Sequence, residues 1–312
     1  MKNTVSYLNS EIANDAESFV LRCERGYHGK LKNLASVIAG KPDLKIIMVA
    51  GPSGSGKTTS SHILREKLND EGINSQILSL DNFFLGREKL PLQPDGDYDF
   101  ESVYALDLDR LDLCFTDLIN NGRCAAPVFD FKTGYPADRT LDIELPDNEV
   151  LVIEGLHALN PLVSKALPKN TALKVFVSVA SSIYGDDGME VLSGQQVRFC
   201  RRMSRDNIYR NASAQNTIKM WRDVCDGEKK WITPFKDGAD ITIDTFHPYE
   251  INLFAKRITE MLRLLSRGLH DSVYVDKIRE GLEKFLPLDI DFVPQDSLIR
   301  EFVEGGKFEA VT

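Results

Sequence analysis

Apolar and polar residues alternate in blocks along this chain, with short apolar runs separated by longer amphipathic segments. The short runs have the length and the content of β-branched residues that are typical of buried parallel strands. They span residues 46–50, 73–80, 149–153, 173–180 and 239–245. Helical spacing of apolar positions occurs at 59–68, 106–118 and 249–266. Strands that alternate with helices predict an α/β fold, with a doubly wound and mostly parallel sheet that is covered on both faces.

Helical additions are expected at both ends of this core. Residues 1–42 predict two amphipathic helices, the first starting at Asn9 or Ser10. Their apolar stripe either packs on the core, as such stripes usually do, or forms a dimer contact. The tail contains one amphipathic helix around 275–285 and then an irregular acidic end. We therefore expect a helical N-terminal appendage (1–42), a central domain (43–270) and a helical C-terminal tail (271–312).

The loop after the first strand carries the strongest chemical signal. Residues 51–58, G-P-S-G-S-G-K-T, fit G-x-x-x-x-G-K-[ST] between a predicted strand and a predicted helix, which is the context that a phosphate-binding loop (P-loop) requires. Glycines let backbone N–H groups turn around an anion, and the helix N-terminus adds partial positive charge. Lys57 can reach the β- and γ-phosphates, and the Thr58 hydroxyl can hold Mg²⁺. The predicted nucleotide contacts are Gly51, Pro52, Ser53, Gly54, Ser55, Gly56, Lys57, Thr58 and Thr59.

Two acids follow predicted strands near this loop. Asp81 comes directly after the second apolar run, and Glu154 directly after the third. Ligands of doubly wound sheets bind beyond the carboxyl ends of the strands, so both acids are placed where chemistry occurs. Asp81 is either a general base or metal ligand, or it only caps the next turn. Glu154 matches the strand-plus-acid element that holds Mg²⁺ through water in P-loop enzymes.

An arginine-rich helix is predicted after Gly194. Its arginines are Arg198, Arg201, Arg202, Arg205 and Arg210. All of them share or adjoin one stripe at helical spacing except Arg210, which is predicted to point elsewhere. Guanidinium groups pair bidentately with phosphate and can neutralise a transferring phosphoryl group. With the glycines before it as a hinge, this helix is either a catalytic lid, in which Asp206 orients an arginine, or a basic surface face.

A hairpin is predicted between the second and third apolar runs. Its strands lie at 125–129 and 140–145, around the tip D-F-K-T-G-Y-P at 130–136. Aromatic residues beside polar ones at such a tip either line a small-molecule pocket or are ordinary hairpin packing. The preceding segment, 85–104, is loop-like and acidic but lacks the spacing of a calcium loop, so we expect a solvated loop.

Composition narrows the class of protein. The 312 residues are 42% hydrophobic and 27% charged, as in an ordinary globular protein. A formal net charge of −9 argues against a nucleic-acid partner. Scattered cysteines suit reduced thiols, the N-terminus lacks the apolar core of a signal peptide, and no apolar run approaches a membrane span. We expect a cytoplasmic protein without a membrane partner, and a homo-oligomer is compatible with these features.

Six short motifs occur in order along the chain. They are G-P-S-G-S-G-K-T (51–58), L-S-L-D-N-F-F (78–84), F-D-F-K-T (129–133), V-I-E-G (152–155), R-R-M-S-R-D (201–206) and P-F-K-D-G-A-D (234–240). From about residue 44 to 245 their order and spacing resemble the uridine kinase and phosphoribulokinase family. The resemblance implies a P-loop NTPase fold with a substrate-binding β-hairpin and an arginine-rich lid helix. It also implies that ATP or GTP, with Mg²⁺, phosphorylates a small-molecule hydroxyl, above all the 5′-hydroxyl of a nucleoside such as uridine or cytidine.

The same resemblance implies roles for individual residues. The residues matching the family's catalytic positions are Asp81 as general base, Lys57 at the phosphates, and the lid arginines Arg201, Arg202 and Arg205. The expected Mg²⁺ positions are Thr58, Asp81 and Glu154. The expected acceptor contacts are Asp81, Glu101 at the ribose hydroxyls, Phe129 and Asp130 at the base, Arg139 and Arg210.

The hairpin departs from the family pattern. The usual Thr/Ser-His-x-Arg run is replaced by Thr133-Gly134 and extra residues before Arg139, so the base-contacting histidine is absent. A same-fold kinase for another small alcohol, such as a sugar phosphate or pantothenate, is therefore an alternative. A catalytically silent nucleotide sensor is a further alternative, although a sensor would not need the general base. Neither N-K-x-D nor D-x-x-G occurs, which argues against a GTPase switch.

Overall fold

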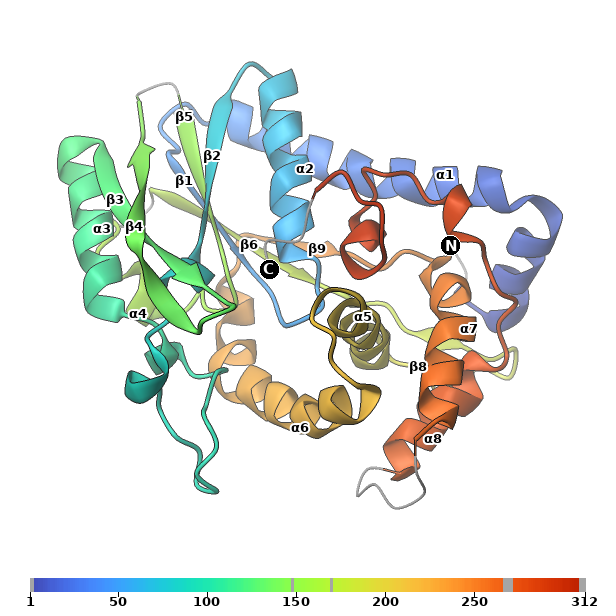
Figure 1. Cartoon of the computed structure of the whole chain (residues 1–312). Coiled ribbons are helices and arrows are strands. Elements are labelled where there is room, and N and C mark those ends of the chain that lie inside the picture. The colour runs from blue at the N-terminus through green and yellow to red at the C-terminus, as the bar shows by residue number, and fades with distance from the viewer. Residues whose placement is uncertain (1–2, 147–148, 169–170, 266–271, 309–312) are drawn as a thin grey trace.

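A parallel sheet of five strands forms the centre of the molecule (Figure 1). The computed structural model describes residues 3–146, 149–168, 171–265 and 272–308. In spatial order the strands are β2 (Asn74–Ser79), β5 (Glu149–Glu154), β1 (Ile46–Ala50), β6 (Ala172–Ser178) and β9 (Ile241–Asp244). They correspond to the five predicted apolar runs, so the predicted α/β fold is confirmed.

Helices cover both faces of the sheet (Figure 1). The helices of the described residues are α1 (Val5–Ala39), α2 (Lys57–Asp70), α3 (Leu108–Asn121), α4 (Pro161–Ser164), α5 (Gly194–Tyr209), α6 (Ala214–Trp231), α7 (Glu250–Arg263) and α8 (Ser272–Leu282). Successive side chains of β1 point to opposite faces. Ile47 and Val49 join the core that contains α1, α2 and α7, whereas Met48 and Ala50 join the core that contains α3. Burial on both faces explains why a continuous apolar run marks this strand in the sequence.

The N-terminal helix α1 is part of the core, as predicted for an apolar stripe. Phe19 and Tyr27 of α1 are buried in the same cluster as the side chains of α2. The helix boundaries differ from the prediction. Thr4 caps the first turn, and the helix breaks at Asp15, whose carboxylate accepts a hydrogen bond from the Ser18 N–H at 3.0 Å. The break lies on the exposed side of the helix and leaves the apolar spacing almost intact, so the sequence pattern did not reveal it.

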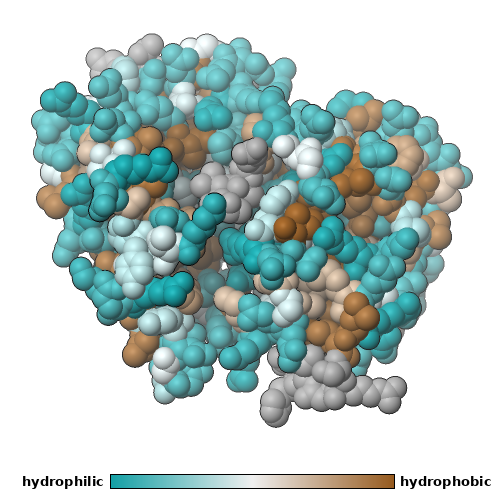
Figure 2. Space-filling view, in the orientation of Figure 1, coloured by the Kyte–Doolittle hydropathy of each residue, from teal (hydrophilic) through white to brown (hydrophobic). Residues whose placement is uncertain are grey.

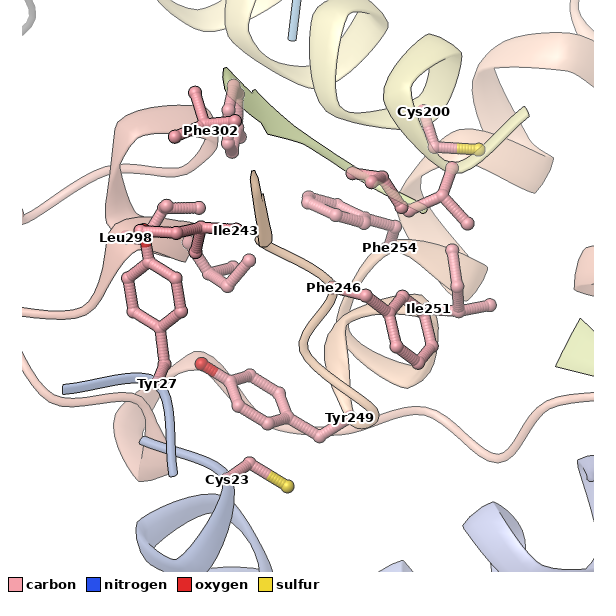
Figure 3. Packing of buried hydrophobic residues seen from close by; sticks show 14 of the residues in the cluster. Cys23, Tyr27, Cys200, Ile243, Phe246, Tyr249, Ile251, Phe254, Leu298 and Phe302 are labelled. Atoms are coloured by element: carbon pink, nitrogen blue, oxygen red, sulfur yellow. The ribbon is translucent and has the colours of Figure 1, made fainter. Parts of the chain in front are cut away.

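The C-terminal segment also enters this core. Helix α8 confirms the amphipathic helix predicted near 275–285, and two 3-10 turns follow, η5 (Ile290–Phe292) and η6 (Leu298–Phe302). Leu298 and Phe302 share a buried cluster with Tyr27 of α1 (Figure 3). The division into 1–42, 43–270 and 271–312 remains a prediction. One cluster of buried side chains contains residues from all three parts.

Among the described residues, two hairpins lie outside the central sheet. The predicted one consists of β3 (Arg123–Asp130) and β4 (Tyr135–Glu144), whose strands are longer than the sequence indicates. The other consists of β7 (Ile183–Tyr184) and β8 (Glu190–Leu192), and its turn contains two of the glycines expected to form a hinge. Neither this second hairpin nor α6 is among the predicted elements.

Hydrophilic side chains cover most of the face shown in Figure 2, and the hydrophobic residues on it form separate groups. Within the described ranges, no helix combines the length and the apolarity that crossing a membrane requires.

Candidate active site

The P-loop and both predicted acids meet at the carboxyl edge of the sheet. β5 lies between β1 and β2, and its last residue, Glu154, is in register with Val49 of β1 and Ser79 of β2. The P-loop starts directly after β1, and Asp81 lies just beyond β2 in the 3-10 turn η1 (Leu80–Phe83). Parallel pairing thus brings together groups that are far apart in the sequence.

The P-loop takes a path that only glycine permits. Gly54 and Gly56 have φ angles of +74° and +84°, in the left-handed region that favours glycine. A Cβ on Gly51 would lie 2.1 Å from the carbonyl oxygen of Val177 in β6. The loop leads into α2, whose N-cap, Gly56, offers no side-chain acceptor. The first amides of α2 therefore need another acceptor, and an anion can supply it.

Asp81 and Glu154 are acids whose pKa values are raised at this edge. Ser79 Oγ accepts the hydrogen bond from the Asp81 N–H, so a different side chain caps η1. Burial raises the pKa of Asp81, against the attraction of Lys57, Arg210 and Arg205. Burial, and next the neighbouring Asp81 charge, raises the pKa of Glu154. Two carboxylates that disfavour each other's charge suit a position beside a cation.

The donor set at this point fits Mg²⁺ held mainly by its nucleotide. Thr58 Oγ1 lies 3.5 Å from Glu154 Oε2, so a hydroxyl and a carboxylate face the same space. Among the described residues, no group of three or more His, Cys, Asp or Glu side chains could hold a metal ion. Mg²⁺ that takes one or two protein oxygens and completes its shell with phosphate and water needs no such cage.

Three of the five arginines of the basic segment line the cavity beside the P-loop. They are Arg202, Arg205 and Arg210. Asp206 pairs with all three, at N···O distances of 3.2, 2.9 and 3.5 Å, which confirms that this acid orients arginines. Arg202 Nη1 also donates to Ser53 Oγ in the P-loop at 2.9 Å. The prediction that Arg210 points away from the other arginines is wrong. Helix α5 ends at Tyr209, so helical spacing does not set the direction of Arg210.

The other two arginines, Arg198 and Arg201, contact the P-loop from outside the cavity. Arg201 is fully buried, donates to the Gly54 carbonyl at 3.2 Å and pairs with Glu250 at 2.6 Å. Arg198 donates to the Ser53 carbonyl at 3.0 Å. Neither arginine lines the cavity, so the structure gives Arg201 a positioning contact in place of the expected phosphate contact. Helix α5 is buried along most of its length, unlike the basic surface face that was the alternative to a lid, and its role as a lid remains a prediction.

A cavity of about 600 Å³ joins the P-loop to an aromatic acceptor end. Phe129 lies at the centre of this end, with ring centroids 5.8 Å from Phe84 and 5.1 Å from Phe131. Glu101 lines the same cavity, and burial raises its pKa to about 7 against the attraction of Arg202. The buried Glu101 Oε2 has no hydrogen-bond partner among the described residues. An apolar platform beside an unsatisfied acceptor suits a flat ligand that carries hydroxyls.

The tip of the β3–β4 hairpin differs from the prediction in its polar contacts. Asp130 accepts a hydrogen bond from the Lys132 N–H at 2.8 Å and closes the turn, and neither Asp130 nor Arg139 lines the cavity. Gly134 has a φ of +79°, and the Nε atom of Arg87 lies 2.6 Å from the point that a Cβ there would occupy. Arg87 lines the cavity, so a guanidinium lies against the tip at which the family histidine is absent.

Residues of the C-terminal segment complete the wall of the cavity near α2. Glu301 and Phe308 line it together with His62 of α2, and the His62 and Phe308 rings are stacked with centroids 5.5 Å apart. Nothing in the local sequence pattern indicates these residues. They reach the site only because the tail folds back across α2.

The sequence matches the model of the Phosphoribulokinase / Uridine kinase family over residues 46–251, which is more than half of the chain. The uridine kinase of Ureaplasma urealyticum is 28% identical over 201 residues, covering 64% of this chain and 86% of the relative. The uridine kinase of Staphylococcus aureus is 28% identical over 199 residues, with the same coverage of both chains.

A solved structure gives a similar result for the fold. A protein described as a fructose transport system kinase, from Silicibacter, superposes with a TM-score of 0.51 and 17% identity. The match covers 68% of this chain and 98% of that chain. At this identity the likeness concerns the fold alone. The matched family span excludes α1 and the C-terminal segment that contains Glu301.

Proposed function

Because the chain belongs to the phosphoribulokinase / uridine kinase family, we propose that it transfers the γ-phosphoryl group of ATP or GTP to the 5′-hydroxyl of a nucleoside. The observation that carries this proposal is the composition of the cavity. The same space is lined by the P-loop, by the acid Asp81 and by an aromatic platform with Glu101 beside it. A site for nucleotide binding alone would not need the platform or the acid.

The donor end of the cavity binds the triphosphate. The first amides of α2 and the Lys57 ammonium contact the phosphates, and Thr58 and Glu154 would hold Mg²⁺. Bound Mg²⁺ would offset negative charge on the β- and γ-phosphates. Arg202, Arg205 and Arg210 face the same space and balance the charge that spreads over the transferring group.

Transfer itself requires one proton acceptor. The 5′-oxygen of the acceptor forms a bond to the γ-phosphorus, the bond to the bridging oxygen breaks, and the hydroxyl proton passes to a carboxylate oxygen of Asp81. The products are the nucleoside monophosphate and ADP or GDP. Asp81 must be ionised for this step; burial raises its pKa, and the cationic groups around it, Lys57 first among them, favour the ionised form.

The acceptor end selects the nucleoside. The base stacks on the cluster of Phe84, Phe129 and Phe131, since aromatic rings offer a flat apolar surface. Glu101 Oε2 accepts hydrogen bonds from the ribose hydroxyls. Arg87 donates to carbonyl oxygens of the base, because a guanidinium has only donors. A base that presents carbonyl oxygens, as uracil does, is therefore preferred.

The test is a phosphorylation assay over a panel of acceptors that includes uridine, cytidine, purine nucleosides, sugar phosphates and pantothenate. We expect uridine to give the highest kcat/KM, and the Lys57→Ala variant to provide the background rate. Faster turnover of a sugar phosphate or of pantothenate would replace the nucleoside by that acceptor. Tight binding of ATP without transfer to any acceptor would support a sensor.

A further inference from the structure

The segment from Ser297 to Phe308 is a firmly held part of the donor site, although it lies outside the span that matches the family. Leu298 and Phe302 are fully buried, in the cluster drawn in Figure 3. Arg300 holds the turn by donating to the carbonyl oxygens of Ile290 and Val293 at 3.0 and 2.6 Å. The position of Glu301, which lies between Leu298 and Phe302, is therefore well defined.

Glu301 occupies one of the hydrogen-bond donors at the start of α2. The first amide of this turn with a partner inside the helix is that of Ser60, which donates to the Gly56 carbonyl at 2.9 Å. Amides before it have no partner within the helix. Glu301 Oε2 accepts a hydrogen bond from the Thr59 N–H at 3.3 Å. A carboxylate from the far end of the chain thus sits where an anion would bind.

Two other side chains of η6 pack beside the P-loop and the start of α2. The Leu298 Cδ1 atom lies 2.6 Å from the point that a Cβ on Gly56 would occupy. The Phe302 ring lies against the Arg201 guanidinium, 5.0 Å from its carbon to the ring centroid. Beyond Glu301, Lys307 pairs with Glu66 of α2 at 2.7 Å. The tail therefore follows the P-loop and α2 on both sides of Glu301.

We propose that Glu301 is an internal anion that competes with the phosphates of the donor nucleotide for the start of α2, and so sets the affinity for that nucleotide. An incoming phosphate either displaces the carboxylate from the Thr59 N–H or binds beside its negative charge, and both outcomes weaken binding. The inference rests on the proposed function only in assuming that the P-loop binds the donor's phosphates.

The variant Glu301→Gln tests this, because it keeps the shape of the side chain and an oxygen for Thr59 while it removes the charge. Calorimetric titration of the full chain with ADP and Mg²⁺, and separately with inorganic tripolyphosphate, gives the dissociation constants. We expect both to fall about tenfold in Glu301→Gln. Glu304→Gln, an exposed acid on the same segment, is the matched control and should leave both unchanged.

Unchanged or weaker binding of both ligands by Glu301→Gln would overturn the inference, and so would tighter binding of ADP but not of tripolyphosphate. Thermal unfolding checks that the tail stays docked, and Glu301→Ala, which should also bind more tightly, serves if Glu301→Gln is unstable. If affinity rises but no acceptor is phosphorylated, the inference stands and the proposed function fails. If the wild-type chain and both variants bind neither ligand, both fail.

Discussion

The donor end and the acceptor end of the cavity are held by different kinds of contact. At the donor end, charged side chains fix the loop and each other. Arg198 and Arg201 donate hydrogen bonds to carbonyl oxygens of the P-loop, and Asp206 forms ion pairs with three other arginines. At the acceptor end, Phe129 of the hairpin contacts Phe84, which follows η1, and Phe131 of the hairpin tip, and Phe131 is 41% exposed. In the proposed function, the chemistry of transfer depends on the ionic network, and selectivity depends on the aromatic contacts.

This difference has an energetic cause. A buried charge that loses its partner is strongly destabilising, so Arg201 and Glu250, both fully buried, constrain each other. Aromatic rings carry no net charge, so a change of ring alters the shape of a pocket without leaving an unpaired charge. The acceptor end can therefore change its substrate while the donor end stays intact.

The largest effect should come from the donor end. Lys57→Ala removes the ammonium that we propose binds the phosphates, and we expect kcat/KM to fall by about a thousandfold. Steady-state assays with the best acceptor measure this loss. Lys67→Ala, on the same helix but away from the cavity, is the control and should retain near wild-type activity. Full activity of Lys57→Ala would show that the P-loop does not serve transfer.

The next largest effect should come from the residue that links the two ends. Asp81→Asn keeps the shape of the side chain but cannot accept the hydroxyl proton, so kcat should fall by about several hundredfold. The KM for ATP should change little, because the P-loop is untouched. The control is Asp95→Asn in the exposed loop. An unchanged kcat in Asp81→Asn would exclude Asp81 as the base.

The two ends also differ in how well the sequence predicts them. The apolar run 46–50, the glycine-rich loop and the acids after two strands are local patterns, and the edge rule for parallel sheets brings them together. The roles of Arg201 and Arg210 are less predictable. Burial of Arg201 depends on Glu250, on a distant helix, and the direction of Arg210 depends on where α5 ends.

Contacts made by the C-terminal segment and by the hairpin tip were not predictable from local patterns. Glu301 and Thr59 lie 242 positions apart, and no periodicity or motif connects them. Arg87 is similar, because its place beside Gly134 depends on how the hairpin tip packs against η2 (Arg87–Lys89). Both contacts depend on how distant segments pack against each other, and a local sequence pattern does not encode that packing.

A medium effect is expected at the aromatic platform. Phe129→Ala removes the central ring, and we expect KM for the nucleoside to rise about tenfold while kcat changes little, since stacking on one ring contributes about 1–3 kcal/mol. Measuring both constants under saturating ATP separates the two. Phe292→Ala, a partly exposed ring on the C-terminal segment, is the control. If kcat falls and KM stays constant, the ring orders the P-loop side and the contrast between the two ends disappears.

The smallest effect should be a pH dependence that belongs to the acceptor end. Burial raises the pKa of Glu101 to about 7, so this carboxylate, which we propose accepts the ribose hydroxyls, is about one-tenth ionised at pH 6 and about nine-tenths at pH 8. KM for the nucleoside should therefore fall by up to about tenfold as pH rises across this range. In Glu101→Gln the profile of KM should be flat, and in Asp99→Asn it should remain. A nucleoside that lacks the 2′-hydroxyl should show a weaker dependence with the wild-type enzyme. If KM for the nucleoside still depends on pH in Glu101→Gln, the titrating group is Asp81 or Glu154. Acceptor binding would then be controlled from the donor end.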